Sequence, residues 1–178
     1  MGIVWKFGDD VNTDEIIPGR YSYSTPKDQL GRFAFIEVRP EFSKQVQKGD
    51  IIVAGENFGI GSSREHAALA LKNAGIDVIV AKSFGYIFYR NAVNVGLLPI
   101  QSTEAYSSVG DQDSVTLDMH SFTLVNHTKN TQVKLPMPSQ FILTVYRLGG
   151  ILNAFKTNLE KNVDVFCFLK NKMEVDVL

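Results

Sequence analysis

A serine pair and an arginine stand together at the end of a glycine-rich turn, as Ser62, Ser63 and Arg64. Gly59 and Gly61 precede them, and glycine lets the backbone turn tightly and approach a ligand because no Cβ blocks positive φ values. The amides of a first helical turn, two hydroxyls and a guanidinium would meet here, which suits a carboxylate ligand. A hydroxyl beside Arg64 and the positive end of a helix would also have its alkoxide stabilised, as a serine acting as a base requires.

The same stretch also has the form of a helix capping box. In that arrangement Ser62 accepts a hydrogen bond from the Glu65 amide, and the Glu65 side chain reaches back to the Ser62 amide. Capping is the usual role of such a tetrad. The two interpretations do not exclude each other, since one serine can cap the helix while its neighbour does chemistry.

A second polar segment, residues 9–14, is dense in side-chain oxygens. Asp9 and Asp10 fit a solvated turn, whereas Asp14 stands just before an apolar stretch and is better placed to point inward. The three aspartates lack the glycine and the distal glutamate of an EF-hand, which argues against a calcium loop. A polar and aromatic loop follows at residues 19–26, and it is either a plain surface connection or part of a site.

The serine pair is expected to lie between a strand and a helix. Residues 50–54 and 78–81 are apolar, β-branched runs, and an alanine-rich helix between them ends at Gly75. A strand, a helix and a strand within about 30 residues form a right-handed βαβ unit with parallel strands. The turn that leads to Arg64 then lies at the carboxyl edge of the sheet, where ligands of α/β folds bind.

Two further helices are predicted from their first residues. Thr25 is predicted to cap a short helix that starts at Pro26, and Ser83 to cap an aromatic helix at residues 84–94. Asn91, on the second of these helices, is expected to tie it to a neighbouring carbonyl.

The predicted fold class is α/β, with a mixed sheet, flanking helices and an antiparallel meander towards the C-terminus. Residues 3–7 and 97–100 are predicted strands of the main sheet. The meander consists of short alternating strands at residues 114–118, 121–125 and 132–135. A helix at residues 140–148 follows and is interrupted by two glycines, and an alternating run at 163–169 is a candidate extra strand.

Composition fits a soluble globular protein of 178 residues, with 44% hydrophobic and 21% charged residues. The net charge of −1 argues against a nucleic-acid partner, and no run approaches the ~20 apolar residues of a membrane span. The first residues lack the pattern of a secretory signal, so we expect a cytoplasmic protein. The single cysteine, Cys167, excludes an internal disulfide and cannot by itself hold an iron–sulfur cluster.

Three motifs, at residues 9–19, 61–67 and 81–91, together resemble the aconitase superfamily and follow one another in the order of that family. The length and the start of the chain resemble the separate small subunits of the isopropylmalate dehydratase branch, which has close relatives in homoaconitase. The resemblance covers residues 1–155, a swivelling domain of aconitase type. It leaves residues 156–178 as a C-terminal extension of unknown role.

The resemblance implies a swivelling β/β/α domain that closes over a large subunit carrying a [4Fe–4S] cluster, with no metal held by this chain. It implies reversible removal and re-addition of water on a small hydroxy-dicarboxylate, with iron binding the departing hydroxyl. By the family motif Ser62 is the base that removes the proton from the neighbouring carbon. Ser63 and Arg64 would bind a substrate carboxylate, and Asp14 would orient or polarise these groups.

Substrate choice in this family lies in the loop that here contains Tyr21 and Tyr23. Homoaconitases resemble Tyr-Leu-Arg-Thr in this loop, and Tyr23 stands where their arginine would pair with an additional carboxylate. A phenol suits an apolar pocket better, which favours the alkyl branch of 2- and 3-isopropylmalate, the leucine-biosynthesis substrates. Homoaconitate and methylmalate-type or dimethylmalate-type substrates remain alternatives. A carboxylate-binding regulatory module without turnover is the non-enzymatic alternative.

Overall fold

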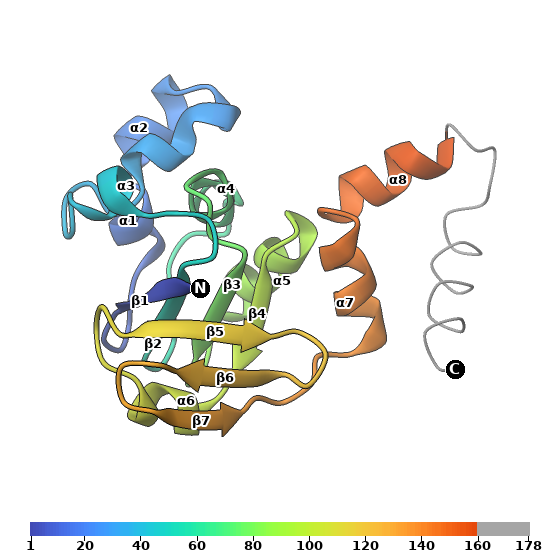
Figure 1. Cartoon of the computed structure of the whole chain (residues 1–178). Helices are drawn as coiled ribbons and strands as arrows, with labels where there is room; N and C mark the ends of the chain where they lie inside the picture. The colour runs from blue at the N-terminus through green and yellow to red at the C-terminus, as the bar shows by residue number, and fades with distance from the viewer. Residues whose placement is uncertain (160–178) are drawn as a thin grey trace.

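Seven strands form one sheet in the computed structural model, which describes residues 1–159 (Figure 1). The strands lie in the order β4-β3-β2-β1-β5-β6-β7. Their bounds are Gly2–Lys6 for β1, Ile51–Ala54 for β2, Val78–Ala81 for β3, Leu98–Gln101 for β4, Ser114–Asp118 for β5, Thr123–Asn126 for β6 and Thr131–Lys134 for β7. Strands β1 to β4 pair in parallel, and β1 joins the antiparallel strands β5, β6 and β7. The predicted βαβ unit and the predicted meander are both confirmed.

Side chains of the parallel strands alternate between two apolar cores, one on each face of the sheet. In β2, Ile52 and Ala54 face one core, whereas Ile51 and Val53 face the other. This alternation follows from the two-residue period of a strand. Because both faces are covered, these strands carry continuous apolar runs instead of alternating apolar and polar residues.

The antiparallel half of the sheet covers one face of the parallel half. Val115 of β5, Leu124 of β6 and Val133 of β7 belong to the same core as Val53 and Val80 of the parallel strands. Figure 1 shows the meander, in yellow and orange, lying across the strands behind it. The molecule therefore has a layer of helices, a parallel layer and an antiparallel layer, which confirms the predicted mixed-sheet β/β/α fold class.

Helices and the site loops occupy the other face. The helices in this part of the chain are α1 (Thr13–Ile16), α2 (Gly19–Ser24), the 3₁₀ helix η1 (Lys27–Phe33), α3 (Phe42–Gln45), α4 (His66–Asn73) and α5 (Tyr86–Asn94). α4 packs against η1, and Leu30 and Leu71 between them are fully buried. Gly31 makes this close packing possible, since a Cβ there would lie 2.5 Å from the Asn73 carbonyl carbon.

The predicted helix cap at Thr25 is wrong. Residues 19–24, predicted as a loop, form the short helix α2, and Thr25 ends that helix. The following helix, η1, begins only at Lys27 and is a 3₁₀ helix. Pro26 does stand just before this helix, so the proline was a correct sign of a new helix and the threonine was not.

The predicted cap at Ser83 is also wrong. The Ser83 hydroxyl accepts a hydrogen bond from the Asn57 amide at 2.8 Å, so it holds the loop after β2 instead. α5 begins after Gly85 and has no side-chain hydrogen bond at its first turn. The aromatic helix itself is present. Its apolar spacing places Phe84, Ile87 and Phe88 on one stripe, of which Phe88 is buried in the core, Phe84 is partly buried and Ile87 is 45% exposed.

The later helices pack beside the sheet. α6 (Thr103–Ser108) follows β4, and α7 (Gln140–Arg147) and α8 (Ile151–Leu159) are separated by the two predicted glycines. Gly149 and Gly150 have φ values of +74° and +109°, which end the first helix. α8 runs across the predicted boundary after residue 155. The rest of the predicted extension, including the candidate strand at 163–169 and Cys167, lies outside the described residues.

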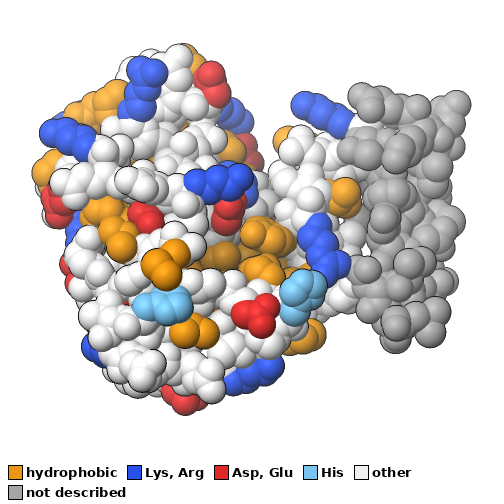
Figure 2. Space-filling model, viewed as in Figure 1, with side chains coloured by type: hydrophobic (Ala, Val, Ile, Leu, Met, Phe, Trp, Pro, Cys, Tyr) orange, Lys and Arg blue, Asp and Glu red, His pale blue; other side chains and the backbone are white. Residues whose placement is uncertain are grey.

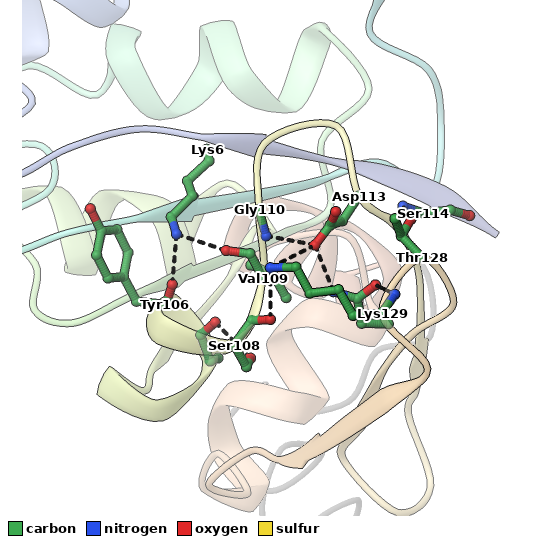
Figure 3. Close-up of polar contacts among 11 residues, drawn as sticks. Lys6, Tyr106, Ser108, Val109, Gly110, Asp113, Ser114, Thr128 and Lys129 are labelled. Carbon is green, nitrogen blue, oxygen red and sulfur yellow. Dashed lines mark hydrogen bonds and ion pairs between the residues drawn. The ribbon is translucent and has the colours of Figure 1, made fainter.

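A lysine ties the end of β1 to the segment that leads into the meander (Figure 3). Lys6 Nζ donates to the carbonyls of Tyr106 and Val109, at 2.9 and 2.7 Å, and lies 4.4 Å from the centre of the Tyr106 ring. Elsewhere, acidic and basic side chains are interspersed on the face shown in Figure 2. Within residues 1–159 no helix combines the length and apolarity needed to cross a membrane.

Candidate functional site

Two loops meet at the carboxyl edge of the parallel strands, where the sequence predicted the serine pair to lie. The Thr13 amide donates to the Ile60 carbonyl at 2.8 Å, and the Gly59 amide donates to the Val11 carbonyl at 2.8 Å. Asn12 and Ile60 also form a short parallel bridge. The polar segment 9–14 and the glycine-rich turn are thereby joined into one site.

Asp9 strengthens this junction from the other end of the polar segment. Its carboxylate accepts a hydrogen bond from the Glu56 amide at 2.7 Å and lies 3.6 Å from Lys82 Nζ. The hydrogen bond from Glu56, assisted by Lys82, lowers the pKa of the Asp9 carboxyl group. Asp9 is therefore a structural anchor of the loop, which goes beyond the solvated turn that the sequence indicated.

Gly61 allows the closest approach between the two loops. Its φ value is +111°, and a Cβ there would lie 2.7 Å from Asn12 Oδ1 and 2.9 Å from Thr13 Oγ1. The next residue, Ser62, donates from its amide to Thr13 Oγ1 at 2.8 Å. The lack of a side chain at position 61 thus lets the serine pair lie directly against the polar segment.

The predicted capping box is wrong. α4 begins at His66, with Glu65 as its N-cap and no side-chain hydrogen bond at that cap. Glu65 instead pairs with Lys27, at 2.8 Å from Oε1 to Nζ. The Ser62 oxygen accepts a hydrogen bond from the Arg64 amide at 3.2 Å. A backbone donor aimed at this oxygen stabilises negative charge on it, as an alkoxide base needs.

Arg64 extends from this turn towards the polar segment. Its Nη2 lies 3.5 Å from Asp14 Oδ1, and its Nη1 donates to the Tyr23 hydroxyl. The Asp14 amide is itself held by Asn12 Oδ1, at 2.9 Å. The Asp14 and Arg64 side chains are 65% and 36% exposed, so solvent screens their attraction and the pair adds little stability. With five N–H donors, the guanidinium can still bind a carboxylate.

Ser63 is held from the opposite side, by α5. Asn91 Nδ2 donates to the Ser63 carbonyl at 3.1 Å. This confirms the predicted tie from Asn91, and the carbonyl that it reaches is part of the site. The backbone of Ser63 is therefore hydrogen-bonded to α5, and the backbone of Ser62 is hydrogen-bonded to the polar segment.

A small open hollow lies where these groups converge. Its polar lining consists of Thr13, Asp14, Ser22, Ser62, Arg64 and His66. Three of the predicted site residues, Ser62, Asp14 and Arg64, are thus brought together. The other three, Ser63, Tyr21 and Tyr23, lie beside the hollow without lining it.

The helical form of α2 explains which side chain of this segment faces the hollow. Tyr21 stacks on Phe33, with ring centroids 4.4 Å apart and planes 10° apart. Tyr23 is 74% exposed, and its ring centroid lies 5.3 Å from the Arg64 guanidinium carbon. Ser22 lies between them, is only 6% exposed and faces the hollow. Because a loop was predicted for this segment, the sequence did not indicate that Ser22 points inward.

Sequence reasoning also missed Thr13 and His66. Thr13 is 3% exposed, and nothing in the sequence separates its role from that of the polar residues on either side. His66 is the first residue of α4, and its Nδ1 is buried with no hydrogen-bond partner among the described residues. Its one sequence signal was its position just after the serine pair. No group of three His, Cys, Asp or Glu side chains within residues 1–159 is arranged to hold a metal ion.

Known proteins share both the sequence and the structure of this chain. A family model described as the aconitase C-terminal domain matches residues 9–105. The 3-isopropylmalate dehydratase small subunit 1 of Archaeoglobus fulgidus is 43% identical over 162 residues, covering 90% of this chain and 99% of the relative. The methanogen homoaconitase small subunit of Methanothermobacter thermautotrophicus is 44% identical over 162 residues, covering 91% and 94%.

A solved structure agrees with these relatives. The crystal structure of 3-isopropylmalate dehydratase from Methanocaldococcus jannaschii is 42% identical and superposes with a TM-score of 0.83. The match covers 90% of this chain and 95% of that structure. The structural similarity therefore covers most of the chain, and the matching family model spans both loops of the site.

Proposed function

The chain belongs to the aconitase C-terminal domain family, and from this premise we propose that it is the small subunit of a hydro-lyase that interconverts 2- and 3-isopropylmalate. Its similarity to small subunits of both isopropylmalate dehydratase and homoaconitase supports the reaction class more strongly than the substrate. The single observation that carries the proposal is the convergence of Ser62, Asp14 and Arg64 on one hollow. We further propose that the complex works in the cytoplasm.

Ser62 is the proposed base. Its oxygen takes the proton from the carbon next to the one that bears the hydroxyl, while the hydroxyl leaves with Lewis-acid assistance that the partner subunit would supply. When water adds back, Ser62 gives the proton to the carbon that lost the hydroxyl, and the hydroxyl joins the neighbouring carbon, which interconverts the two isomers. The Arg64 amide, 3.2 Å from the serine oxygen, stabilises the charged form of Ser62. No step needs a second base from this chain.

Arg64 and Asp14 are proposed to place the substrate. The fork of the Arg64 guanidinium binds a substrate carboxylate with two parallel hydrogen bonds, which fixes the carbon to be deprotonated relative to Ser62. Asp14, 3.5 Å from Arg64, orients that guanidinium. Ser63 is proposed to bind the same carboxylate from beside the hollow.

The proposal assigns the [4Fe–4S] cluster to a large-subunit partner. Such clusters are normally held by several cysteine thiolates, and this sequence has one cysteine. The described residues likewise offer no ligand group for a metal ion. The residues of this chain therefore do not fit the cluster, and they form one part of a site that a second subunit completes.

Tyr23 favours isopropylmalate over homoaconitate. It carries no charge to pair with an additional carboxylate, and it lies on the Arg64 guanidinium with its ring largely exposed. An alkyl branch can pack on an aromatic ring. Homoaconitate remains the second candidate, because a homoaconitase small subunit is as similar in sequence as the isopropylmalate dehydratase subunits.

Reconstitution tests the proposal directly. The chain is mixed with a large subunit that carries its cluster, and the ultraviolet absorbance of the unsaturated intermediate is followed with isopropylmalate and, separately, with homoaconitate. We expect turnover with both subunits present and a higher kcat/KM for isopropylmalate. A higher kcat/KM for homoaconitate would reverse the substrate choice. Absence of activity with any hydroxy-dicarboxylate would contradict the enzyme assignment and favour the carboxylate-binding module.

A further inference from the structure

We propose that Thr13 is a positioning residue for the proposed reaction. Its hydroxyl holds the backbone of Ser62 in a fixed position relative to the backbone of Asp14. The inference rests on the proposed function, in which Ser62 is the base. In this proposal the Thr13 side chain affects the reaction only through the position of Ser62. Thr13 is not needed for any step of proton transfer itself.

A short chain of hydrogen bonds links the two candidate catalytic residues through Thr13. Thr13 Oγ1 accepts from the Ser62 amide at 2.8 Å and donates to Asn12 Oδ1 at 3.4 Å. The same Asn12 oxygen accepts from the Asp14 amide at 2.9 Å. One buried hydroxyl therefore connects the backbone of Ser62 with the backbone of Asp14.

The turn that carries Ser62 depends on such contacts. Residues 62–64 precede Glu65, the N-cap of α4, so the hydrogen-bond ladder of that helix does not hold them. Gly61 before them has a positive φ value, a conformation that few other residues adopt. In the described structure, two side chains donate to or accept from the backbone of the serine pair: Thr13 from one side and Asn91 from the other.

The chemistry of threonine, and not only its shape, is required at this position. Thr13 is 3% exposed, and valine has nearly the same shape but no hydroxyl. That residue would leave the Ser62 amide without its acceptor in a part-buried place, which a backbone donor tolerates poorly. The turn would then shift to satisfy the amide, and the Ser62 oxygen would move with it.

Thr13→Val tests this role, because valine keeps the shape and removes the hydroxyl. The variant is assayed as the complete two-subunit enzyme with isopropylmalate. We expect kcat to fall about 10-fold to 100-fold, since small displacements of a reacting group cost that much, while KM changes by less than about threefold. Thr13→Ser keeps the hydroxyl and should restore kcat to within about threefold of the wild type.

Thr144→Val is the matched control. Thr144 is also a buried threonine, at 4% exposure, but it lies on α7 and its hydroxyl has no hydrogen-bond partner among the described residues. Its replacement should leave kcat and KM unchanged. Thermal melting of each variant reports folding. Should Thr13→Val fold poorly, Thr13→Ala removes the same hydroxyl without a branched side chain, and the same loss of kcat is expected.

Three results would overturn the inference. The first is a wild-type kcat in Thr13→Val. The second is a loss in Thr13→Ser as large as in Thr13→Val, which would show that packing and not the hydroxyl matters. The third is wild-type turnover in Ser62→Ala, which would remove the proposed base and with it the role of Thr13. When Ser62→Ala is inactive and Thr13→Val is fully active, the proposed function stands and only the positioning role is wrong.

Discussion

Arg64 meets a phenol in this chain, and that contact bears on substrate choice. Its Nη1 donates to the Tyr23 hydroxyl, and its guanidinium carbon lies 5.3 Å from the centre of the Tyr23 ring. The ring therefore covers one part of the guanidinium and leaves other donors for a carboxylate. A neutral phenol offers a second carboxylate no opposite charge, whereas an alkyl group can pack against its ring.

Tyr23→Arg should shift the preference of the reconstituted enzyme towards homoaconitate. A second guanidinium beside Arg64 can pair with an additional carboxylate, and it removes the ring on which an alkyl branch packs. We expect the ratio of kcat/KM for homoaconitate to that for isopropylmalate to rise by about tenfold or more. Tyr23→Phe keeps the ring and is the control. An unchanged ratio in Tyr23→Arg would contradict the proposed role of Tyr23 in substrate choice.

Some site residues could be predicted from the sequence and others could not. Ser62, Arg64 and Asp14 stand in motifs whose residue types already suggest carboxylate chemistry, and the structure gathers them at one hollow. Ser22 was missed because its inward position depends on the phase of α2, a helix of 6 residues in a polar segment without clear periodicity. Thr13 was missed because its partner, the Ser62 amide, lies 49 residues away along the chain.

The two loops of the site depend on close backbone approach at Gly61. A side chain at this position would face the Asn12 oxygen at 2.7 Å and would have to adopt a φ value of +111°. The close contact and the backbone strain would both destabilise the junction between the polar segment and the serine pair. The turn is therefore sensitive to the addition of one carbon atom.

Gly61→Ala should lower both stability and turnover. Backbone strain of this kind costs about 1–3 kcal/mol, so the free energy of unfolding in urea should fall by a similar amount. The kcat of the reconstituted enzyme should fall with it, because Ser62 follows directly. Gly8→Ala is the matched control, since a Cβ at Gly8 meets no atom within 4 Å. Equal stability and activity in the two variants would contradict the strained junction.

At the level of elements, the sequence was informative about strands and less so about helix starts. β2 and β3 are continuous apolar runs, because both faces of these strands are buried. The strands of the meander alternate between apolar and polar residues, because only one of their faces is buried. The predicted caps at Ser83 and Ser62 failed because their hydroxyls bind elsewhere: Ser83 accepts from the Asn57 amide, and Ser62 accepts from the Arg64 amide. The short sequence pattern around a serine does not show which backbone amide its hydroxyl will bind in the folded chain.

A buried aspartate ties the segment before β5 to β6 and to the turn that follows β6 (Figure 3). Asp113 precedes β5, and its carboxylate accepts from the Gly110 amide at 2.6 Å and from Asn126 Nδ2 at 2.7 Å. Lys129 Nζ lies 3.3 Å from the same carboxylate. The Gly110 hydrogen bond, supported by Asn126 and Lys129, lowers the pKa of the Asp113 carboxyl group.

This lowered pKa predicts a loss of stability in acid. A carboxyl group whose folded pKa lies below its unfolded value stabilises the fold fully above the unfolded value, about 3.9, and less as pH falls through the folded pKa. The melting temperature should therefore decline below about pH 4. Asp113→Asn should be less stable at pH 7, by about 1–3 kcal/mol, and should show a smaller decline in acid.

The control for this prediction is Asp28→Asn, which removes the same charge at an exposed position outside the meander. Melting temperatures of the wild type and both variants are compared from pH 2 to pH 7. If the melting temperature of Asp113→Asn fell as steeply in acid as that of the wild type, protonation of Asp113 would not be a cause of the acid destabilisation.

As a whole, the molecule gathers its candidate site at the edge of its parallel layer. The chain offers a candidate base, a carboxylate-binding guanidinium and an orienting carboxylate, but its described residues gather no metal ligands. The helix layer and the meander support this edge from both sides of the sheet. We propose that a partner subunit completes this site and that Ser62 supplies the base.

The most direct test is the turnover of the two-subunit enzyme with Ser62→Ala in this chain. We predict that kcat falls by at least ~10²-fold while KM stays nearly unchanged, because the hydroxyl acts in proton transfer more than in binding. Ser107→Ala, on the exposed face of α6, should retain full activity. Near-normal kcat in Ser62→Ala would contradict the account.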